Sequence, residues 1–143
     1  MLDHLGFRVQ DLLRSRRFYE ACVAPIGLQV IDNTPDSFLI GRSAEQPLPF
    51  IWVGTAPPAF WTSAHLTSSS PIHLGFQAPD RAAVDEFYRR AIAAGGKDNG
   101  GPGARGPTGF NYYAAYVLDP DGNNIEAGVR ENTALPGHDT AAG

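Results

Sequence analysis

The sequence predicts an α+β domain built from two tandem βαβββ modules, and three observations lead to this fold class. The segment that begins at His4 recurs from His73 onward. In each copy a short strand-like run precedes a helical stripe, and further strand-like runs follow it. The last two runs are joined by Asp-Pro-Asp-Gly at 119–122, a strong turn because Pro presets φ and Gly accepts positive φ. We therefore interpret residues 1–143 as one domain.

The repeat aligns residues 4–27 with residues 73–96 without a gap, at an offset of 69 residues. Nine of these 24 aligned positions are identical, whereas chance would give about one or two at ordinary residue frequencies. The identical pairs are His4/His73, Leu5/Leu74, Gly6/Gly75, Phe7/Phe76, Asp11/Asp80, Phe18/Phe87, Tyr19/Tyr88, Ala24/Ala93 and Gly27/Gly96. We interpret the repeat as a duplication.

In the first copy, residues 4–9 form a strand-like run, and Asp11 is placed to cap the helix that follows. Gly27 ends this helix, because glycine tolerates left-handed geometry. Three strands follow at about 28–31, 37–41 and 49–54. The buried face of the helix is predicted from residues at helical spacing, namely Ser15, Phe18, Tyr19, Cys22 and Ile26.

The second copy repeats this pattern: Asp80 caps its helix and Gly95-Gly96 ends it, with strands expected at about 97–99, 112–118 and 123–129. Its helical stripe consists of Val84, Phe87, Tyr88, Ala91 and Ile92. Module one thus spans about 1–54 and module two about 71–130. A linker rich in Pro, Ser and Thr joins them at 55–70, a Gly/Pro-rich loop occupies 100–109, and 131–143 forms a tail.

Composition narrows the function classes. A formal net charge of -4 and a pI near 5.4 argue against a nucleic-acid partner. The single cysteine, Cys22, excludes an internal disulfide and a cysteine-type zinc site, and it favours a reducing compartment. No apolar stretch is long enough to span a bilayer, and no leader pattern precedes the first strand. We expect a cytoplasmic protein with no membrane partner.

Alternation along the strands places three metal-ligand types on one face. The apolar residues of the first strand must face the helix, so His4 faces the opposite side, and its repeat His73 does the same. On the last strand, Ile125 and Ala127 form the core side and leave Glu126 on the histidine side. A glycine two residues after each histidine leaves open space beside the imidazole.

Two pseudo-symmetric modules would bring His4 and His73 together, with Glu126 joining them. Two imidazoles and a carboxylate suit Fe(II), and they also fit Mn, Co, Ni or Zn. Glu126 is the candidate catalytic residue as well as a ligand. The alternative is that each histidine is a hydrogen-bonded structural residue and that Glu126 is a surface carboxylate.

Other candidates for substrate contact share the predicted cavity. Arg8 and Gln77 lie on the histidine face and could bind an anionic or polar group, although a surface role is open for each. On the penultimate strand, alternation puts Tyr113 opposite Tyr112 and Tyr116. We take Tyr113 and Tyr116 as candidates, because the sequence does not decide which side lines the cavity.

The segment HLGFRVQDLLRSRRFY, its echo HLGFQAPD and the closing DPDGNNIEA resemble the vicinal oxygen chelate superfamily over roughly residues 2–130. That group includes glyoxalase I, bleomycin-resistance proteins, fosfomycin-resistance transferases, methylmalonyl-CoA epimerases and extradiol dioxygenases. The resemblance implies a cupped mixed sheet around one divalent metal, with ligand roles at His4, His73 and Glu126. It also implies a small substrate chelated through vicinal oxygens, in a lyase, isomerase or ring-cleaving dioxygenase reaction.

The sequence departs from the family pattern at Trp52. Many members carry a fourth ligand on the last strand of module one, and aligning 50–53 with 124–127 places Trp52 there. Tryptophan cannot ligate a metal, so it would offer an aromatic wall to a substrate or only fill the cup. The bleomycin-resistance branch implies an alternative function, metal-free sequestration of a small molecule at a dimer cleft. A homodimer is expected in either case.

Overall fold

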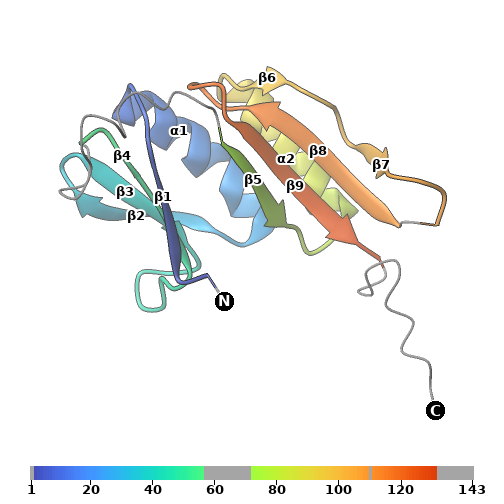
Figure 1. Cartoon of the computed structure of the whole chain (residues 1–143), viewed down its shortest axis with the longest axis horizontal. Helices are drawn as coiled ribbons and strands as arrows, with labels where there is room; N and C mark the ends of the chain where they lie inside the picture. Colours follow the sequence, from blue (N-terminus) through green and yellow to red (C-terminus); the bar gives the residue numbers. More distant parts are fainter. Residues whose placement is uncertain (1, 57–71, 110, 132–143) are drawn as a thin grey trace, which may run out of the picture.

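The computed structural model describes residues 2–56, 72–109 and 111–131. Module one runs β1 (His4–Arg8), α1 (Leu12–Val23), a 3₁₀ turn (Ala24–Ile26), β2 (Gln29–Thr34), β3 (Ser37–Gly41) and β4 (Phe50–Gly54) (Figure 1). Module two runs β5 (His73–Gln77), α2 (Arg81–Ala93), β6 (Lys97–Asp98), β7 (Gly103–Arg105), β8 (Tyr112–Leu118) and β9 (Asn124–Arg130). The predicted α+β class and the duplicated module are confirmed.

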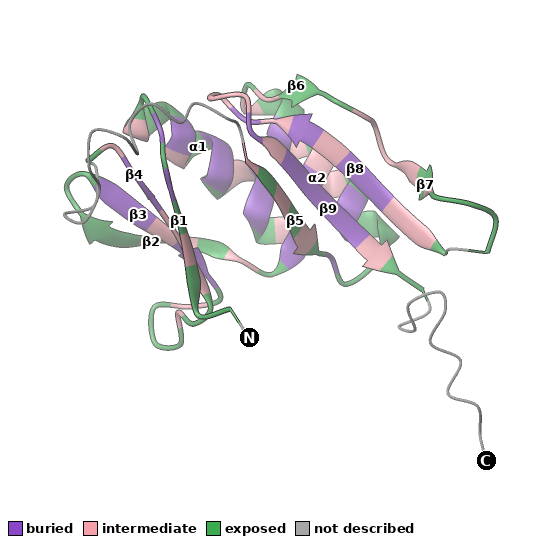
Figure 2. Ribbon diagram, in the orientation of Figure 1, coloured by how far each residue is buried: buried purple, intermediate pink, exposed green. Residues whose placement is uncertain are grey.

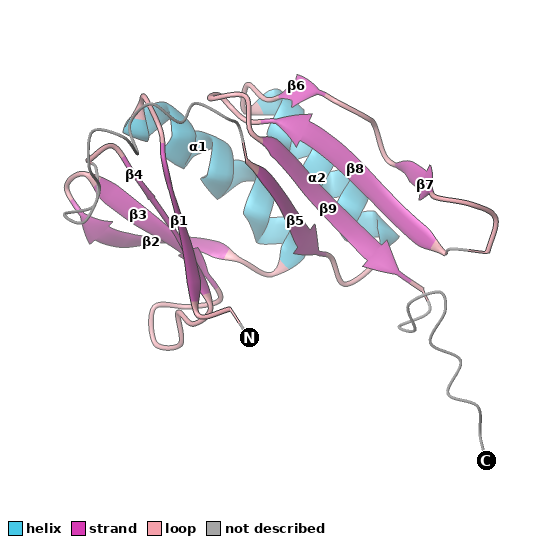
Figure 3. Ribbon diagram, in the orientation of Figure 1, coloured by secondary structure: helices cyan, strands magenta, loops and turns pink. Residues whose placement is uncertain are grey.

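Each module builds its own mixed sheet, and both helices lie on the same side of the two sheets (Figures 1 and 3). We call them sheet A, with strand order β1-β4-β3-β2, and sheet B, with order β5-β9-β8-β6 and β7 paired to β8. In both sheets the first strand of the module is an edge strand that runs parallel to the last one. The remaining pairs are antiparallel.

The strand β7 was not predicted, because it lies inside the Gly/Pro-rich segment expected to be a loop. Its sequence, Gly103–Arg105, carries no alternating apolar pattern, and its pairing to β8 uses backbone groups alone. The predicted linker from residue 57 onward, which includes His65, lies outside the described residues. So does the tail from residue 132, which includes His138.

Both helices begin where the sequence predicts: the Asp11 side chain accepts from the Arg14 N–H at 2.9 Å, and Asp80 accepts from Ala83 at 2.8 Å. After α1, the chain passes through the 3₁₀ turn and reverses at Gly27, whose φ is +78°. One stripe position is wrong. Ile92 is 37% exposed, because α2 packs through the neighbouring face that carries Ala83, Val84, Phe87 and Ala91.

The core lies between the helices and the inner faces of the sheets (Figure 2). It contains an aromatic cluster in which the Tyr19 ring packs against Phe7, Phe18 and Phe38, with centroid distances of 5.0 to 6.3 Å. Cys22 is fully buried in this core, and burial raises the pKa of its thiol, so it has no thiolate character at neutral pH.

Buried hydrogen bonds join the turn at residues 119–122 of module two to α1. The Tyr19 hydroxyl donates to Asp119 Oδ2 at 2.7 Å, across a sequence separation of 100 residues. Asn123 donates to both oxygens of Asp119, through its backbone N–H at 2.8 Å and its amide at 2.9 Å. Asp121, two positions after Asp119, accepts from the Gln10 N–H at 3.0 Å in a more exposed contact. The Asp-Pro-Asp-Gly turn is therefore an inter-module contact as well as a hairpin.

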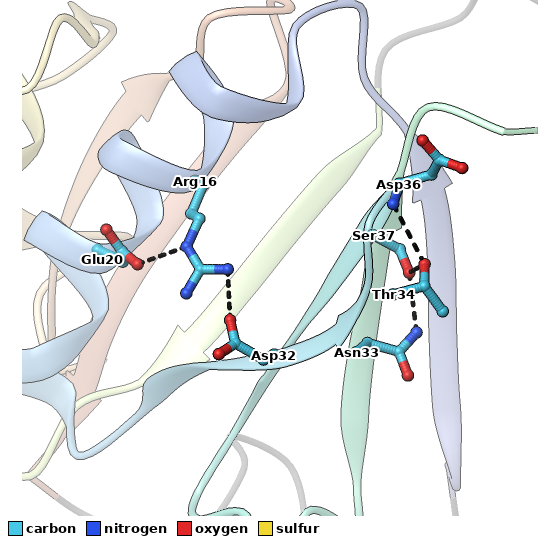
Figure 4. A network of polar contacts seen from close by, with 7 residues as sticks. All are labelled: Arg16, Glu20, Asp32, Asn33, Thr34, Asp36 and Ser37. Carbon is cyan, nitrogen blue, oxygen red and sulfur yellow. Dashed lines mark hydrogen bonds and ion pairs between the residues drawn. The ribbon is translucent and has the colours of Figure 1, made fainter.

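A more exposed network ties α1 to the outer strand of sheet A (Figure 4). Arg16 bonds to Glu20 at 2.7 Å and to Asp32 on β2 at 2.6 Å, and these partners raise the pKa of its guanidinium. These carboxylates are exposed, so the pairs contribute little to stability. Among the residues described, neither helix combines the length and hydropathy of a membrane-spanning segment.

Candidate metal and substrate site

The face of sheet B that points away from the helices gathers the chemistry-bearing side chains of module two. Strand alternation and the observed register put them on one side. We call this the open face of sheet B, and its members are His73, Gly75 and Gln77 on β5, Glu126, Gly128 and Arg130 on β9, Tyr112 and Tyr116 on β8, and Arg105 on β7.

His73 and Glu126 form the centre of this face. The imidazole Nε2 lies 3.1 Å from Glu126 Oε2, and the Glu126 side chain is 9% exposed, against 54% for His73. The other ring nitrogen, Nδ1, lies 3.1 Å from the Asn124 carbonyl oxygen and 3.0 Å from its side-chain amide. A Cβ placed on Gly75 would meet only Glu126 Oε2, at 3.7 Å, so the space beside the pair is open.

Two tyrosines lie beside the Glu126 carboxylate. The Tyr112 hydroxyl donates to Glu126 Oε1, and Tyr116 lies opposite Glu126 in the register of β8 and β9. Burial and the Glu126 carboxylate both raise the pKa of Tyr112, and the same two causes raise that of Tyr116. Both phenols are therefore neutral at physiological pH.

Tyr112 was not among the predicted site residues, although one signal could have pointed to it. Gly128 follows Glu126 by two positions and so lies on the same face. A Cβ at Gly128 would overlap the Tyr112 hydroxyl. Glycine at this position gives the phenol room to reach back along the sheet to Glu126.

Tyr113, a predicted substrate contact, lies on the other side of sheet B. Its hydroxyl donates to Asp85 on α2 at 2.7 Å, and the Arg81 guanidinium lies 4.9 Å from its ring centroid. Strand alternation explains the outcome, since Tyr113 points opposite to Tyr112 and Tyr116. The structure therefore separates Tyr113 from Glu126, while it brings Tyr116 to it.

His4 does not join His73 and Glu126 within one chain. Its Nδ1 lies 2.7 Å from Asp3 Oδ1, and its ring stacks on Phe50 with a centroid distance of 5.1 Å. Within 2–56, 72–109 and 111–131, no three potential metal ligands converge. The reason is topological: β1 and β5 belong to different sheets and run in opposite directions, so their first residues lie at opposite ends (Figure 1).

Trp52 occupies the place in sheet A that Glu126 occupies in sheet B. Gly6 pairs with Trp52 in the same register in which Gly75 pairs with Glu126, as the sequence alignment predicts. The indole lies over Gly54, where a Cβ would overlap it, and 3.5 Å from the Cβ position of Gly6. Trp52 therefore lies on the face that carries His4, with its indole packed against Gly6 and Gly54.

The two remaining predicted contacts lie in different surroundings. Arg8 donates from Nε and Nη2 to the Thr55 carbonyl oxygen, at 3.0 and 2.8 Å. Its guanidinium is therefore bonded to the residue that directly follows β4. Gln77 lines a pocket of about 360 Å³ beside Tyr112. The other lining residues are Gly75, Phe76, Gly128 and Arg130.

The family model of the Glyoxalase/Bleomycin resistance protein/Dioxygenase superfamily matches residues 1–127. The chain belongs to this superfamily. A glyoxalase/bleomycin resistance protein from Albidiferax ferrireducens T118 has a similar structure, with a TM-score of 0.68 and 30% identity over 91% of this chain and 98% of that one. An uncharacterised protein from Pseudomonas aeruginosa is 32% identical over 135 residues, which are 87% of this chain and 85% of that one.

Other members of the superfamily share the fold at lower identity. The lactoylglutathione lyase from Agrobacterium tumefaciens has a TM-score of 0.63 and 22% identity, over 94% of this chain and 97% of that one. At this identity the likeness shows the glyoxalase fold alone. The reaction must therefore be argued from the site.

Proposed function

We propose that this superfamily member is a metal-dependent enzyme that acts on a small substrate bound through two neighbouring oxygens. The observation that carries the proposal is the pair formed by His73 Nε2 and Glu126 Oε2. Two ligand atoms that each lie about 2.1 Å from one metal are separated by about 3 Å, and these two atoms are 3.1 Å apart. Imidazole and carboxylate together suit Fe, Mn, Co, Ni or Zn.

We propose that His4 completes the site from a second copy of the chain. His4 is the first residue of an edge strand, its side chain is 58% exposed, and it lies on the face of sheet A that points away from the helix. Homodimerisation would place this face, with Trp52, opposite the open face of sheet B. The metal site would then be shared by two chains, with three protein ligands and open positions for substrate.

The side chains around the pair suit this chemistry. A bound divalent metal would supply a Lewis acid for a substrate oxygen. Tyr112 orients the Glu126 carboxylate, as outer partners of metal ligands commonly do, and Tyr116 lies opposite it. Glu126, buried beside a phenol, is the group at which a proton of the substrate can be held. Lyase, isomerase and ring-cleaving dioxygenase reactions are all compatible with this arrangement.

Metal content tests the proposal. The full chain would be purified without chelator, offered Fe(II), Mn(II), Ni(II) or Zn(II), and measured for metal per chain beside the H73A and E126A variants. Glu86→Ala, which removes a carboxylate from the outer face of α2, is the matched control. We expect metal in the wild type and in the control but not in the two site variants. Absence of all four metals from the wild type would contradict the proposal.

A second candidate function is metal-free sequestration of an aromatic ligand. It is favoured by the aromatic side chains on the open faces, Trp52, Tyr112 and Tyr116, and by the absence of His4 from the pair within one chain. Fluorescence titration with aromatic ligands, with and without a chelator, separates the two functions. Binding that ignores the chelator and is weakened in Trp52→Ala would favour sequestration.

A further inference from the structure

His4 and His73 are repeat partners, but their ring nitrogens have different neighbours. His4 Nδ1 lies 2.7 Å from the Asp3 carboxylate, which only accepts hydrogen bonds when it is ionised. His73 Nδ1 lies 3.1 Å from the Asn124 carbonyl oxygen and 3.0 Å from the Asn124 amide nitrogen, so one residue offers it both an acceptor and a donor. A neutral imidazole carries its proton on one nitrogen only, and such neighbours decide which one.

The Asn124 amide is held in the orientation that turns its donor toward the ring. Asn124 pairs with His73 in the register of β5 and β9, which brings the two residues side by side. Asn99, the residue after β6, donates from its Nδ2 to Asn124 Oδ1 at 3.1 Å. Because the Oδ1 atom of Asn124 is engaged in this way, its Nδ2 atom is the one that faces His73 Nδ1.

The far nitrogen of His73 favours the same tautomer. Nε2 lies 3.1 Å from Glu126 Oε2. A lone pair on Nε2 would face the lone pairs of the carboxylate and be repelled, whereas an N–H at this place is attracted to the negative charge. In the metal-free chain both neighbours of His73 therefore favour a proton on Nε2, with Nδ1 accepting from Asn124. The Asp3 carboxylate favours the opposite arrangement at His4, with the proton on Nδ1.

We propose that Asn124 is a positioning residue that holds metal-free His73 as the Nε2–H tautomer, opposite to the Nδ1–H tautomer of His4. The inference rests on the proposed function in one respect, the use of His73 Nε2 as a metal ligand. For that use the proton leaves Nε2 and Nδ1 gains one, so the ring stays neutral. The Asn124 carbonyl oxygen then accepts from Nδ1, as backbone partners of ligating histidines commonly do. Since the donor and the acceptor belong to one residue, the ring keeps its place in both tautomers.

The tautomers can be measured without metal. The full chain, isotope-labelled and freed of metal with a chelator, is studied at about pH 9, well above the ordinary pKa of imidazole. Long-range proton–nitrogen correlation spectra identify the protonated nitrogen of each ring, and His4→Ala and His73→Ala assign the signals. Asn124→Asp replaces the donor by an acceptor of the same shape and keeps an oxygen for Asn99. Asn33→Asp, at an exposed asparagine of module one, is the matched control.

We expect His73 as Nε2–H and His4 as Nδ1–H in the wild type and in the control. In Asn124→Asp the ratio of Nε2–H to Nδ1–H at His73 should fall about tenfold or more, because a donor is lost and a charged acceptor is gained. The tautomer of His4 should not change. The same tautomer at both histidines of the wild type, or a His73 ratio that does not fall in Asn124→Asp, would overturn the inference.

A second variant decides if Asn124→Asp fails to fold. Asn124→Ala removes the amide and keeps the backbone carbonyl, so the His73 ratio should fall about threefold or more. A ratio that does not fall would contradict the role of the amide. A merely structural Asn124 would lower the thermal midpoint of these variants and leave the tautomer ratio unchanged.

The two proposals can fail separately. If the wild type takes up no metal but shows the two opposite tautomers and the response to Asn124→Asp, the metal site is wrong and the role of Asn124 stands. If the wild type takes up metal while Asn124→Asp leaves the His73 ratio unchanged, the metal site stands and the role of Asn124 is wrong.

Discussion

Removing the Tyr19 hydroxyl should weaken the hydrogen bonding between the two modules without disturbing the core. Tyr19 is fully buried, and its hydroxyl donates to Asp119 at 2.7 Å. In Tyr19→Phe the ring keeps its contacts with Phe7, Phe18 and Phe38, so no cavity forms. Asp119 keeps three donors, from the backbone of Asp121 and from the backbone and amide of Asn123.

The expected cost follows from this geometry. A hydrogen bond to a charged group contributes about 1.5–3 kcal/mol. Because three donors still bond to Asp119 in the variant, we expect the free energy of unfolding to fall by about 2 kcal/mol, within this range. For a domain of this size that lowers the thermal midpoint by roughly 6 °C. Urea unfolding followed by circular dichroism measures the free energy of unfolding. The slope of this free energy against urea concentration should not change.

Tyr113→Phe is the matched control, because its hydroxyl also donates to a carboxylate at 2.7 Å but is exposed. It should cost less than about 0.5 kcal/mol. Equal stability of Tyr19→Phe and Tyr113→Phe would refute the view that the hydrogen bond from Tyr19 to the turn at 119–122 stabilises the contact between the modules. So would a Tyr19→Phe variant as stable as the wild type.

Three further predictions concern pH, packing and reactivity. Burial and Asp119 raise the pKa of Tyr19 well above 10.0. The difference in free energy of unfolding between wild type and Tyr19→Phe is therefore complete below pH 10.0 and declines as pH rises toward the folded-state pKa of Tyr19. Urea unfolding at about pH 8 and about pH 11 checks this. Gly54→Ala should cost about 1–3 kcal/mol, because it displaces Trp52, whereas Gly6→Ala should be milder in the same unfolding assay. Cys22 should react with a thiol reagent only after unfolding, and rapid reaction in the native protein would contradict its burial.

Much of the fold could be predicted because local signals agreed with one another. The duplication provided an internal alignment, and Asp11 and Asp80 marked the helix starts that the structure shows. Alternation assigned Glu126 and His73 to one face, which the registers reproduce. The strand β7 escaped prediction because its pairing depends on backbone groups and not on a side-chain pattern.

The candidate site was harder to predict, because it depends on how side chains bend along a face and how sheets are placed. Alternation separated Tyr113 from Tyr112 but could not say which side was open. That required α2, which holds Tyr113 through Asp85. The position of His4 relative to His73 depends on the relative placement of two sheets, which strand periodicity does not contain.

The central claim is that one metal is held by His73 and Glu126 of one chain and by His4 of another. Complementation tests it most directly. His4→Ala and Glu126→Ala are each expected to bind no metal. Refolded together in equal amounts, they should form mixed dimers with one intact site, which restores about a quarter of the wild-type metal content per chain. A mixture that binds no more metal than its parents, while the wild type binds fully, would contradict the shared site.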